Sequence, residues 1–349
     1  MERTSSLDQQ ASLVVPEFVD HWARELLGEN SVINKLRGGI NNQVYVCSKG
    51  EHKFVIKSYP AKATAKHDRM RAETDFLQFA QHLAPSYVPG LIAQDSERRC
   101  IVLDYVEGVP YKEGENLTEL DVDSAISFIR AINQNKSVIN NFEMQQAADG
   151  FMSISEHMEN VQNRIEALQV DHLPKHFHLL VIEALDKLKT QWERIKLTTE
   201  NSLVRGDVVN VLSEKYQCYS PSDFGFHNAI KTADGVKYID FEFAGKDDPA
   251  KTVSDFFLQP RIPVNQQYIS KFVDAFQDRI NKNDLEKRAR ILSGVLKIKW
   301  ASIILAILNP KRFDGLLHTA EMEDDSDFVM NRLKLANAYL LMENPFGLH

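Results

Sequence analysis

The residues best suited to chemistry lie between positions 221 and 243, which read Pro-Ser-Asp-Phe-Gly-Phe-His-Asn and, after ten further residues, Ile-Asp-Phe-Glu-Phe. Asp223 stands five positions before Asn228, and a second acid, Asp240, follows two apolar residues. One carboxylate can serve as a base, while an amide and another carboxylate offer the oxygen ligands that Mg²⁺ prefers. These three side chains are the polar equipment that kinase-type phosphoryl transfer requires.

In such a reaction Asp223 accepts the proton of a substrate hydroxyl and directs its oxygen at the γ-phosphate of ATP. Asn228 and Asp240 are predicted to hold the magnesium ion. The alternative is that these Asp and Asn side chains only stabilise turns, as they often do. Their joint order, with Lys57 and Glu73 upstream, favours the catalytic interpretation.

A second segment offers similar residues at the wrong spacing. Asp207 follows Arg205-Gly206 and stands three positions before Asn210, rather than five, and no metal-binding acid follows at a matching distance. We therefore assign it no catalytic role. His227, beside Asn228, is treated as a structural loop histidine and is left out of the chemistry.

A glycine-containing run upstream is a candidate phosphate-covering loop. It extends from Leu36 to Gln43 between two predicted strands, and adjacent glycines allow backbone N–H groups to approach a phosphate closely. A simple hairpin turn is the alternative, and the run lacks the Walker pattern. The residues assigned to nucleotide binding in this run are Gly38, Gly39, Asn41 and Asn42.

Lys57 ends the strand-like run Phe-Val-Ile-Lys and is a candidate for anchoring the α- and β-phosphates. A helix is predicted over roughly residues 63–82, with Met70 and Leu77 on its apolar stripe and Glu73 on the same stripe. A buried carboxylate is costly unless it is paired. We therefore expect Glu73 to hold the Lys57 ammonium, against the alternative of an exposed lysine and an ordinary salt bridge.

The remaining pattern predicts an α+β fold with two lobes. Short runs rich in Val, Ile, Tyr and Phe predict antiparallel strands, and longer runs after Glu107-Gly108 have helical periodicity. We expect an N-terminal nucleotide-binding lobe over residues 1–106 and a larger helical lobe over residues 107–349. The strands are Gln43–Cys47, Phe54–Ser58 and Cys100–Tyr105, and the helical stripes are Met158, Val161, Ile165, Leu168 and Leu185, Leu188, Trp192, Ile195.

Composition excludes several function classes. The chain has 349 residues and a net charge of -8 without a basic stripe, so nucleic acid is an unexpected partner. Three widely spaced cysteines and an N-terminus without an apolar signal region predict a cytoplasmic protein. The apolar stretch 291–308 is interrupted by Lys297 and Lys299, so we expect a core helix and no membrane span.

These motifs resemble the aminoglycoside phosphotransferase and choline kinase superfamily, which has the protein-kinase-like fold. The resemblance extends from about Ser31 to about Asn309 and is most specific over the segment 221–243. It implies ATP and Mg²⁺ as cofactors, Asp223 as the base, and Asn228 and Asp240 as metal ligands. It also implies that the strand 102–106 contacts adenine through its backbone, with Asp104 and Val106 as the nucleotide-binding positions.

Two departures from related sequences narrow the reaction. Ser222 precedes the base where many relatives have Gly, which leaves the chemistry intact. Phe-Glu follows Asp240 where protein kinases have Phe-Gly, and only fourteen residues separate Asp240 from Asp255. A protein kinase is therefore disfavoured, and by the resemblance Asp255 is expected to brace the catalytic loop.

The acceptor is expected to be a hydroxyl compound of small size, such as an amino alcohol, an aminoglycoside or a sugar. The acidic run 321–327 is compatible with a cationic acceptor or with a solvated surface, whereas the basic residues near 297 permit an anionic sugar. Arg261, Lys297, Lys299 and Trp300 lie in segments that could border the site. The alternative function is a nucleotide-binding pseudokinase that acts as a scaffold.

Overall fold

The computed structural model describes residues 15–36, 42–60, 67–134, 142–313, 316 and 325–347. The chain divides into two compact units, of which unit 1 comprises Met1–Ala61 and Ile92–Tyr105. Unit 2 comprises Lys62–Leu91 and Val106–His349. Unit 1 ends beside the predicted boundary at residue 106, but the helix expected in the first lobe clusters with unit 2. The compact units divide the chain at other residues than 106, and the domains 1–106 and 107–349 stay a prediction.

Unit 1 is a five-stranded sheet in the order β1-β2-β3-β5-β4, with one helix, α1 (Glu17–Leu27), packed against it. Strands β2 and β3 form a hairpin: Lys49 pairs with His52, and Gly50 takes a φ of 60° that an L side chain rarely adopts. The strands of this unit are β1 (Val32–Leu36), β2 (Gln43–Lys49), β3 (His52–Ser58), β4 (Leu91–Asp95) and β5 (Cys100–Asp104).

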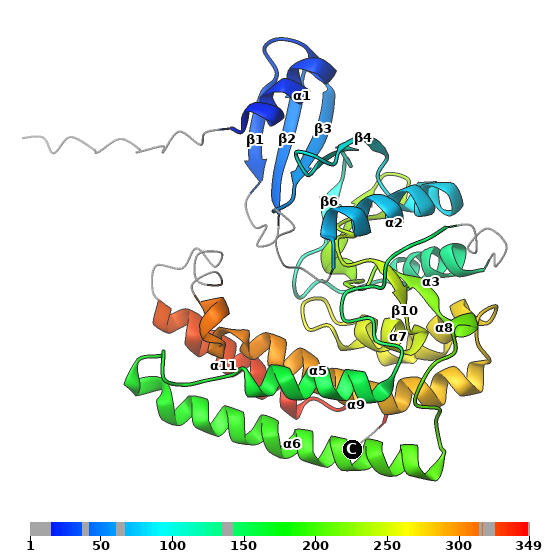
Figure 1. Ribbon diagram of the computed structural model, residues 1–349. Helices are drawn as coiled ribbons and strands as arrows, with labels where there is room; N and C mark the ends of the chain where they lie inside the picture. Colours follow the sequence, from blue (N-terminus) through cyan, green and yellow to red (C-terminus); the bar gives the residue numbers. More distant parts are fainter. Residues whose placement is uncertain are drawn as a thin grey trace, which may run out of the picture. The chain divides into compact units, whose positions relative to one another are not determined.

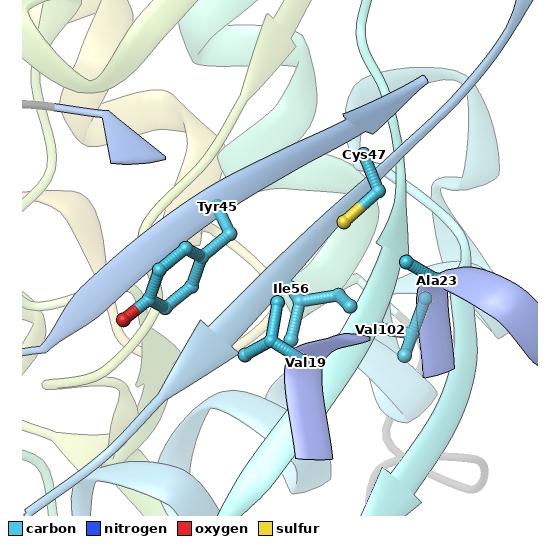
Figure 2. Close-up of a cluster of buried hydrophobic side chains, with 6 residues drawn as sticks. All are labelled: Val19, Ala23, Tyr45, Cys47, Ile56 and Val102. Carbon is cyan, nitrogen blue, oxygen red and sulfur yellow. The ribbon is translucent and has the colours of Figure 1, made fainter. Parts of the chain in front are cut away.

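The core of unit 1 lies between α1 and the sheet, and Figure 2 shows its six buried side chains. Alternate residues of β2 point to this core because successive strand side chains face opposite sides of a sheet. The sequence predicted these strands but not α1, which lies before the first predicted element. The buried residues are Val19, Ala23, Tyr45, Cys47, Ile56 and Val102.

Unit 2 is mainly helical and carries the predicted apolar stripes as buried faces. Met158, Val161 and Ile165 are buried on α5, and Leu188 and Trp192 are buried on α6. The α-helices are α2 (Arg69–Leu83), α3 (Glu119–Asn133), α5 (Ile154–Glu166), α6 (His178–Arg205), α7 (Pro249–Leu258), α8 (Ile269–Val273), α9 (Lys282–Ile304) and α11 (Asp325–Leu341).

Short strands and 3₁₀ turns connect these helices. The strands form a two-stranded sheet, β10-β7, and a three-stranded sheet, β6-β8-β9. The strands are β6 (Val109–Pro110), β7 (Cys218–Ser220), β8 (Ala229–Thr232), β9 (Gly235–Tyr238) and β10 (Gly245–Asp247). The 3₁₀ turns are η1 (Pro85–Tyr87), η2 (Lys175–Phe177), η3 (Glu214–Tyr216), η4 (Phe226–Asn228), η5 (Gln266–Tyr268), η6 (Asp274–Phe276) and η7 (Leu305–Leu308).

The central helix of unit 2 is α9, against which α5, α6 and α7 pack (Figure 1). Together with η7 it is long and apolar enough to cross a bilayer, with a mean hydropathy of 1.9 over its most apolar window. That window is 83% buried within the protein, as expected for a core helix. The prediction of a core helix is confirmed, although burial rather than its two lysines identifies it.

Candidate active site

A hairpin brings the two halves of the 221–243 motif together. Strands β8 and β9 pair from Thr232 and Gly235 back to Ala229 and Tyr238. Beyond the last pair, the Ile239 N–H donates to the carbonyl of Asn228 at 2.9 Å. Asp240 is therefore the next residue after a position hydrogen-bonded to Asn228, although twelve positions separate them in sequence.

Asn228 is oriented by Asp223. Its amide Nδ2 donates to the Asp223 carbonyl oxygen at 3.0 Å and lies 3.4 Å from Oδ2 of the same residue. Because the amide nitrogen is bound to Asp223, the amide oxygen is directed to the other side and is suited to a metal ligand. Asp240 adds a carboxylate one position after the residue bonded to Asn228, and amide and carboxylate oxygens are ligands that Mg²⁺ prefers.

Asp223 is kept ionised by its neighbours. Its side chain is 36% exposed, and Oδ1 accepts a hydrogen bond from His227 Nε2 at 3.1 Å. Burial raises the pKa of Asp223, but the hydrogen bond and charge of His227, the Asn228 amide and, more weakly, Lys299 together hold it below its usual value. A carboxylate in this state is ready to accept a proton.

His227 is therefore part of the site, which the sequence analysis did not predict. Its side chain is 5% exposed, and its Nδ1 is a buried atom with no hydrogen-bond partner in the described part of the chain. Gly225 makes room for the ring, because a Cβ at that position would lie 2.8 Å from Nδ1. The spacing of four residues between Asp223 and His227 was the only signal in the sequence.

Two backbone positions in the motif have unusual conformations. Ser222 has a φ of 66° and Asp240 has a φ of 68°, in the left-handed region that residues other than glycine rarely adopt. Ser222 directly precedes Asp223, and Asp240 is itself the second acid of the site. Such strain persists only where surrounding contacts hold it in place.

A buried ionic network supplies those contacts at Ser222. Lys251 Nζ donates to Ser222 Oγ at 3.0 Å and to Asp247 Oδ2 at 2.7 Å, and it lies 3.5 Å from Asp255 Oδ2. Asp255 also accepts two bonds from Lys299, at 2.7 and 2.8 Å. The expectation that Asp255 braces the catalytic loop thus corresponds to an indirect connection, through Lys251.

The electrostatics of this network follow from its burial. Burial lowers the pKa of Lys251, but the carboxylates of Asp247 and Asp255 outweigh it and raise the pKa above its usual value. Burial raises the pKa of Asp247 to about 6 despite the lysine beside it. Lys251 and Asp255 both belong to α7, four residues apart in a helix with no other charged residue, and that pattern could have revealed the network from the sequence.

The segment 145–150 is hydrogen-bonded to both halves of the 221–243 motif. The Ala148 N–H donates to the Phe243 carbonyl at 3.0 Å, and its own carbonyl accepts from Ser222 Oγ at 3.1 Å. Gly245 allows this approach, since a Cβ there would lie 2.3 Å from the Gln145 carbonyl oxygen. No motif in the sequence indicated a role for residues 145–150.

The two lysines near position 297 have different surroundings. Lys299 is buried against Asp255, whereas Lys297 is half-buried and donates to the carbonyls of Leu340 and Met342. They face different sides of α9, as their spacing predicts. Trp300 Nε1 donates to Asp255 at 2.8 Å, while Arg261 is exposed and lies 3.5 Å from Glu113.

The residues predicted to bind the nucleotide are divided between the two units. Lys57 is 5% exposed on β3, and its Nζ lies 5.9 Å from the centre of the Tyr59 ring. Glu73 is 1% exposed on α2 of unit 2, so its pairing with Lys57 stays a prediction. Asn42 is 9% exposed, Asp104 ends β5, and Val106 follows it. Gly38, Gly39 and Asn41 lie outside the described residues, as does most of the acidic run 321–327.

A model of the phosphotransferase enzyme family (APH) matches residues 32–262 of the chain. No curated protein sequence matches it. Several solved structures do. Choline kinase LicA from Streptococcus pneumoniae has a TM-score of 0.56 at 16% identity, with 93% of this chain and 97% of that chain covered.

Two antibiotic kinases are similar to the same extent. The gentamicin complex of APH(2'')-IIa has a TM-score of 0.56 at 15% identity, covering 99% of this chain and 100% of that chain. Spectinomycin phosphotransferase APH(9)-Ia, in complex with ADP and spectinomycin, has a TM-score of 0.54 at 14% identity, covering 88% and 92%. These similarities confirm the predicted two-lobed, protein-kinase-like α+β fold.

Proposed function

Because the chain belongs to the phosphotransferase enzyme family, we propose that it transfers the γ-phosphate of ATP to a hydroxyl group of a small molecule, with Mg²⁺ as the metal. The observation that carries this proposal is the convergence of Asp223, Asn228 and Asp240 through the β8–β9 hairpin. The ADP bound in the spectinomycin phosphotransferase supports an adenine nucleotide as the donor.

Asp223 is the proposed base and orienting group. Its lowered pKa keeps the carboxylate ionised near neutral pH, so it can accept a hydrogen bond from the acceptor hydroxyl and then its proton. His227 holds one oxygen of this carboxylate at 3.1 Å. The other oxygen remains available for the acceptor, because its contact with Asn228 is long at 3.4 Å.

Asn228 and Asp240 are the proposed magnesium ligands. The described residues contain no group of three or more His, Cys, Asp or Glu side chains that could hold a metal. A magnesium ion bound by two protein oxygens, water and the nucleotide phosphates needs no such group, and when bound it neutralises charge on those phosphates. The proposed nucleotide-binding residues are Gly38, Gly39, Asn41, Asn42, Lys57, Glu73, Asp104 and Val106.

A cytoplasmic location fits this reaction. The three cysteines are buried and unpaired, as is usual where thiols stay reduced, and ATP is abundant in the same compartment.

The test is phosphate transfer from ATP by the full-length protein. Wild type and Asp223→Asn are incubated with ATP, Mg²⁺ and a panel of amino alcohols, aminoglycosides and sugars, while ATP binding is measured separately by calorimetry. We expect wild type to phosphorylate at least one acceptor, and Asp223→Asn to lose turnover on the order of a thousand-fold with ATP affinity retained.

Wild-type protein that binds ATP but transfers phosphate to no acceptor would support the scaffold function instead. Retained turnover in Asp223→Asn would exclude Asp223 as the base. Incorporation of phosphate into a generic protein substrate would point to a protein kinase.

A further inference from the structure

A small polar pocket is lined by residues of α5, of α9 and of the turns that follow these helices. Helices α5 and α9 pack together in unit 2 (Figure 1). Its volume is about 180 Å³. Five of the eight lining residues are polar, two of these are arginines, and none is acidic. The lining residues are Asn163, Arg164, Ala167, Leu168, Ser302, Ala306, Asn309 and Arg312.

The two arginines of this pocket are close enough to repel each other. Burial lowers the pKa of Arg312 and the charge of Arg164 lowers it further, while Asp149 acts in the opposite direction and Arg69 adds a weaker lowering. Within the part of the chain that the structure describes, no hydrogen bond is formed by the Arg312 guanidinium. Arg312 is exposed and lines the pocket with Arg164, so its guanidinium is open to an anion, which would reduce the repulsion between the two cations.

Arg164 is only partly satisfied. Its Nη2 donates to Asp149 Oδ2 at 2.5 Å, but its Nε is buried without a hydrogen-bond partner among the described residues. By contrast, Arg288 in the same unit donates to Asp248 Oδ2 at 2.6 Å and to the carbonyls of Val209 and Met152. Arg288 thus bonds within the protein through all three guanidinium nitrogens, whereas Arg164 keeps a buried Nε without a partner. Buried donors without a partner also occur on Arg130 and Arg279, but neither residue lines this pocket.

The pocket is connected to the catalytic segment by one residue, Asp149. The preceding residue, Ala148, binds Ser222 and Phe243, which flank the two acids of the site. Burial raises the pKa of Asp149, and Arg164, Lys299 and Lys251 together hold it below its usual value. Lys299 also lowers the pKa of Asp223, so the same buried lysine lies near both Asp149 and the proposed base.

We propose that Arg164 and Arg312 bind an anionic group of the acceptor, so that the substrate is a small hydroxyl compound carrying a phosphate or a carboxylate. This inference rests on the proposed function and names its substrate class. Arginine pairs bind such oxyanions through charge-assisted, often bidentate hydrogen bonds. Asn163, Ser302 and Asn309 add neutral hydrogen-bonding groups. The protein as a whole is acidic, with a net charge of -8, so this cationic pocket differs in sign from the overall charge.

The first experiment measures binding without nucleotide. Wild type, Arg312→Gln and the control Arg205→Gln are titrated by calorimetry with hexose 6-phosphates, hexuronic acids, inorganic phosphate and the corresponding neutral hexoses. Arg205 is a suitable control because it is 61% exposed at the end of α6, outside the pocket. We expect the anionic compounds to bind wild type and the control at least about tenfold more tightly than Arg312→Gln, as for loss of a hydrogen bond to a charged group.

The second experiment compares phosphate transfer to matched acceptors that differ only in the anionic group. The anionic acceptor should have the lower KM, and Arg312→Gln should raise that KM about tenfold or more while changing kcat less. Arg164→Gln is a second variant, although loss of its bond to Asp149 also perturbs the segment beside the site.

The outcomes separate this inference from the proposed function. Anion binding that depends on Arg312, without phosphate transfer to any acceptor, would support the anion pocket and contradict the kinase. Transfer to neutral or cationic acceptors with a KM that Arg312→Gln does not change would support the kinase and overturn the anion pocket. Equal binding of phosphate by wild type and Arg312→Gln would also overturn it.

Discussion

Two segments of unit 2 contain an aspartate followed by an asparagine, and they differ in what holds them. In the first, Asp207 is 46% exposed and pairs with the nearby Arg205 at 2.6 Å. Asn210 turns away from it and accepts from the Ser155 N–H at 3.1 Å, which satisfies a donor at the start of α5. In the second, Asn228 binds Asp223 directly.

The two segments differ in which of their residues the distant contacts hold. In the segment at 207 the distant contacts reach the residues after the aspartate. The buried Arg288 donates to the Val209 carbonyl and Asn210 accepts from Ser155, while Asp207 itself pairs with the exposed Arg205. The segment at 223 is fixed by Lys251 and by Ala148, whose contacts with Ser222 are 29 and 74 positions distant in sequence. Residue types supply the chemistry, and distant buried contacts supply the geometry that makes it usable.

The largest expected difference between the two segments is in turnover. Asp240→Asn keeps the shape and the tolerance for a positive φ but removes the metal-binding charge, so turnover should fall on the order of a thousand-fold with little change in Tm. Asn210→Ala should do the opposite, lowering stability by about 1 kcal/mol while turnover is retained. Steady-state kinetics and thermal unfolding of both variants check this. A similar loss of turnover in both variants would remove the distinction.

The second difference concerns stability. Lys251→Met removes a buried cation from between Asp247 and Asp255 and leaves both carboxylates without it, which should cost about 3 kcal/mol or more. Arg205→Met breaks an exposed pair and should cost less than about 1 kcal/mol. Urea unfolding of the two variants measures both values. Equal costs would show that the buried network does not anchor the catalytic segment.

The same contrast explains what the sequence could predict. Spacing within one segment identified Asp223, Asn228 and the nearby Asp240, because a short hairpin converts their order into proximity. It could not predict the bonds of Ala148 to both halves of the motif, which depend on how distant segments fold together. His227 was not included among the predicted site residues, because the sequence around a loop histidine does not identify the residue that it bonds.

The third expected effect is on pH dependence. The hydrogen bond from His227 lowers the pKa of Asp223, and a base must be deprotonated to act, so wild type should stay active as the pH falls towards that lowered value. His227→Leu should raise the pKa of Asp223 and move the acidic limb of kcat to higher pH by about one unit. His227→Gln, which retains a donor, should restore part of the shift. The exposed His21 on α1 provides the control His21→Leu, and an acidic limb that coincides in wild type and His227→Leu would exclude this role.

The smallest effect concerns the backbone at Ser222, where strain and hydrogen bonding oppose each other. Ser222→Ala loses the bonds to Lys251 and Ala148 and keeps the φ of 66°. Ser222→Gly loses the same bonds but relieves a left-handed conformation that costs an L residue roughly 1 kcal/mol. The glycine variant should therefore be more stable than the alanine variant by about 1 kcal/mol, and closer to wild type, in urea unfolding. If alanine proved equal to or more stable than glycine, the network would not be holding a strained backbone beside the base, and the contrast with the segment at 207 would rest on the side chains alone.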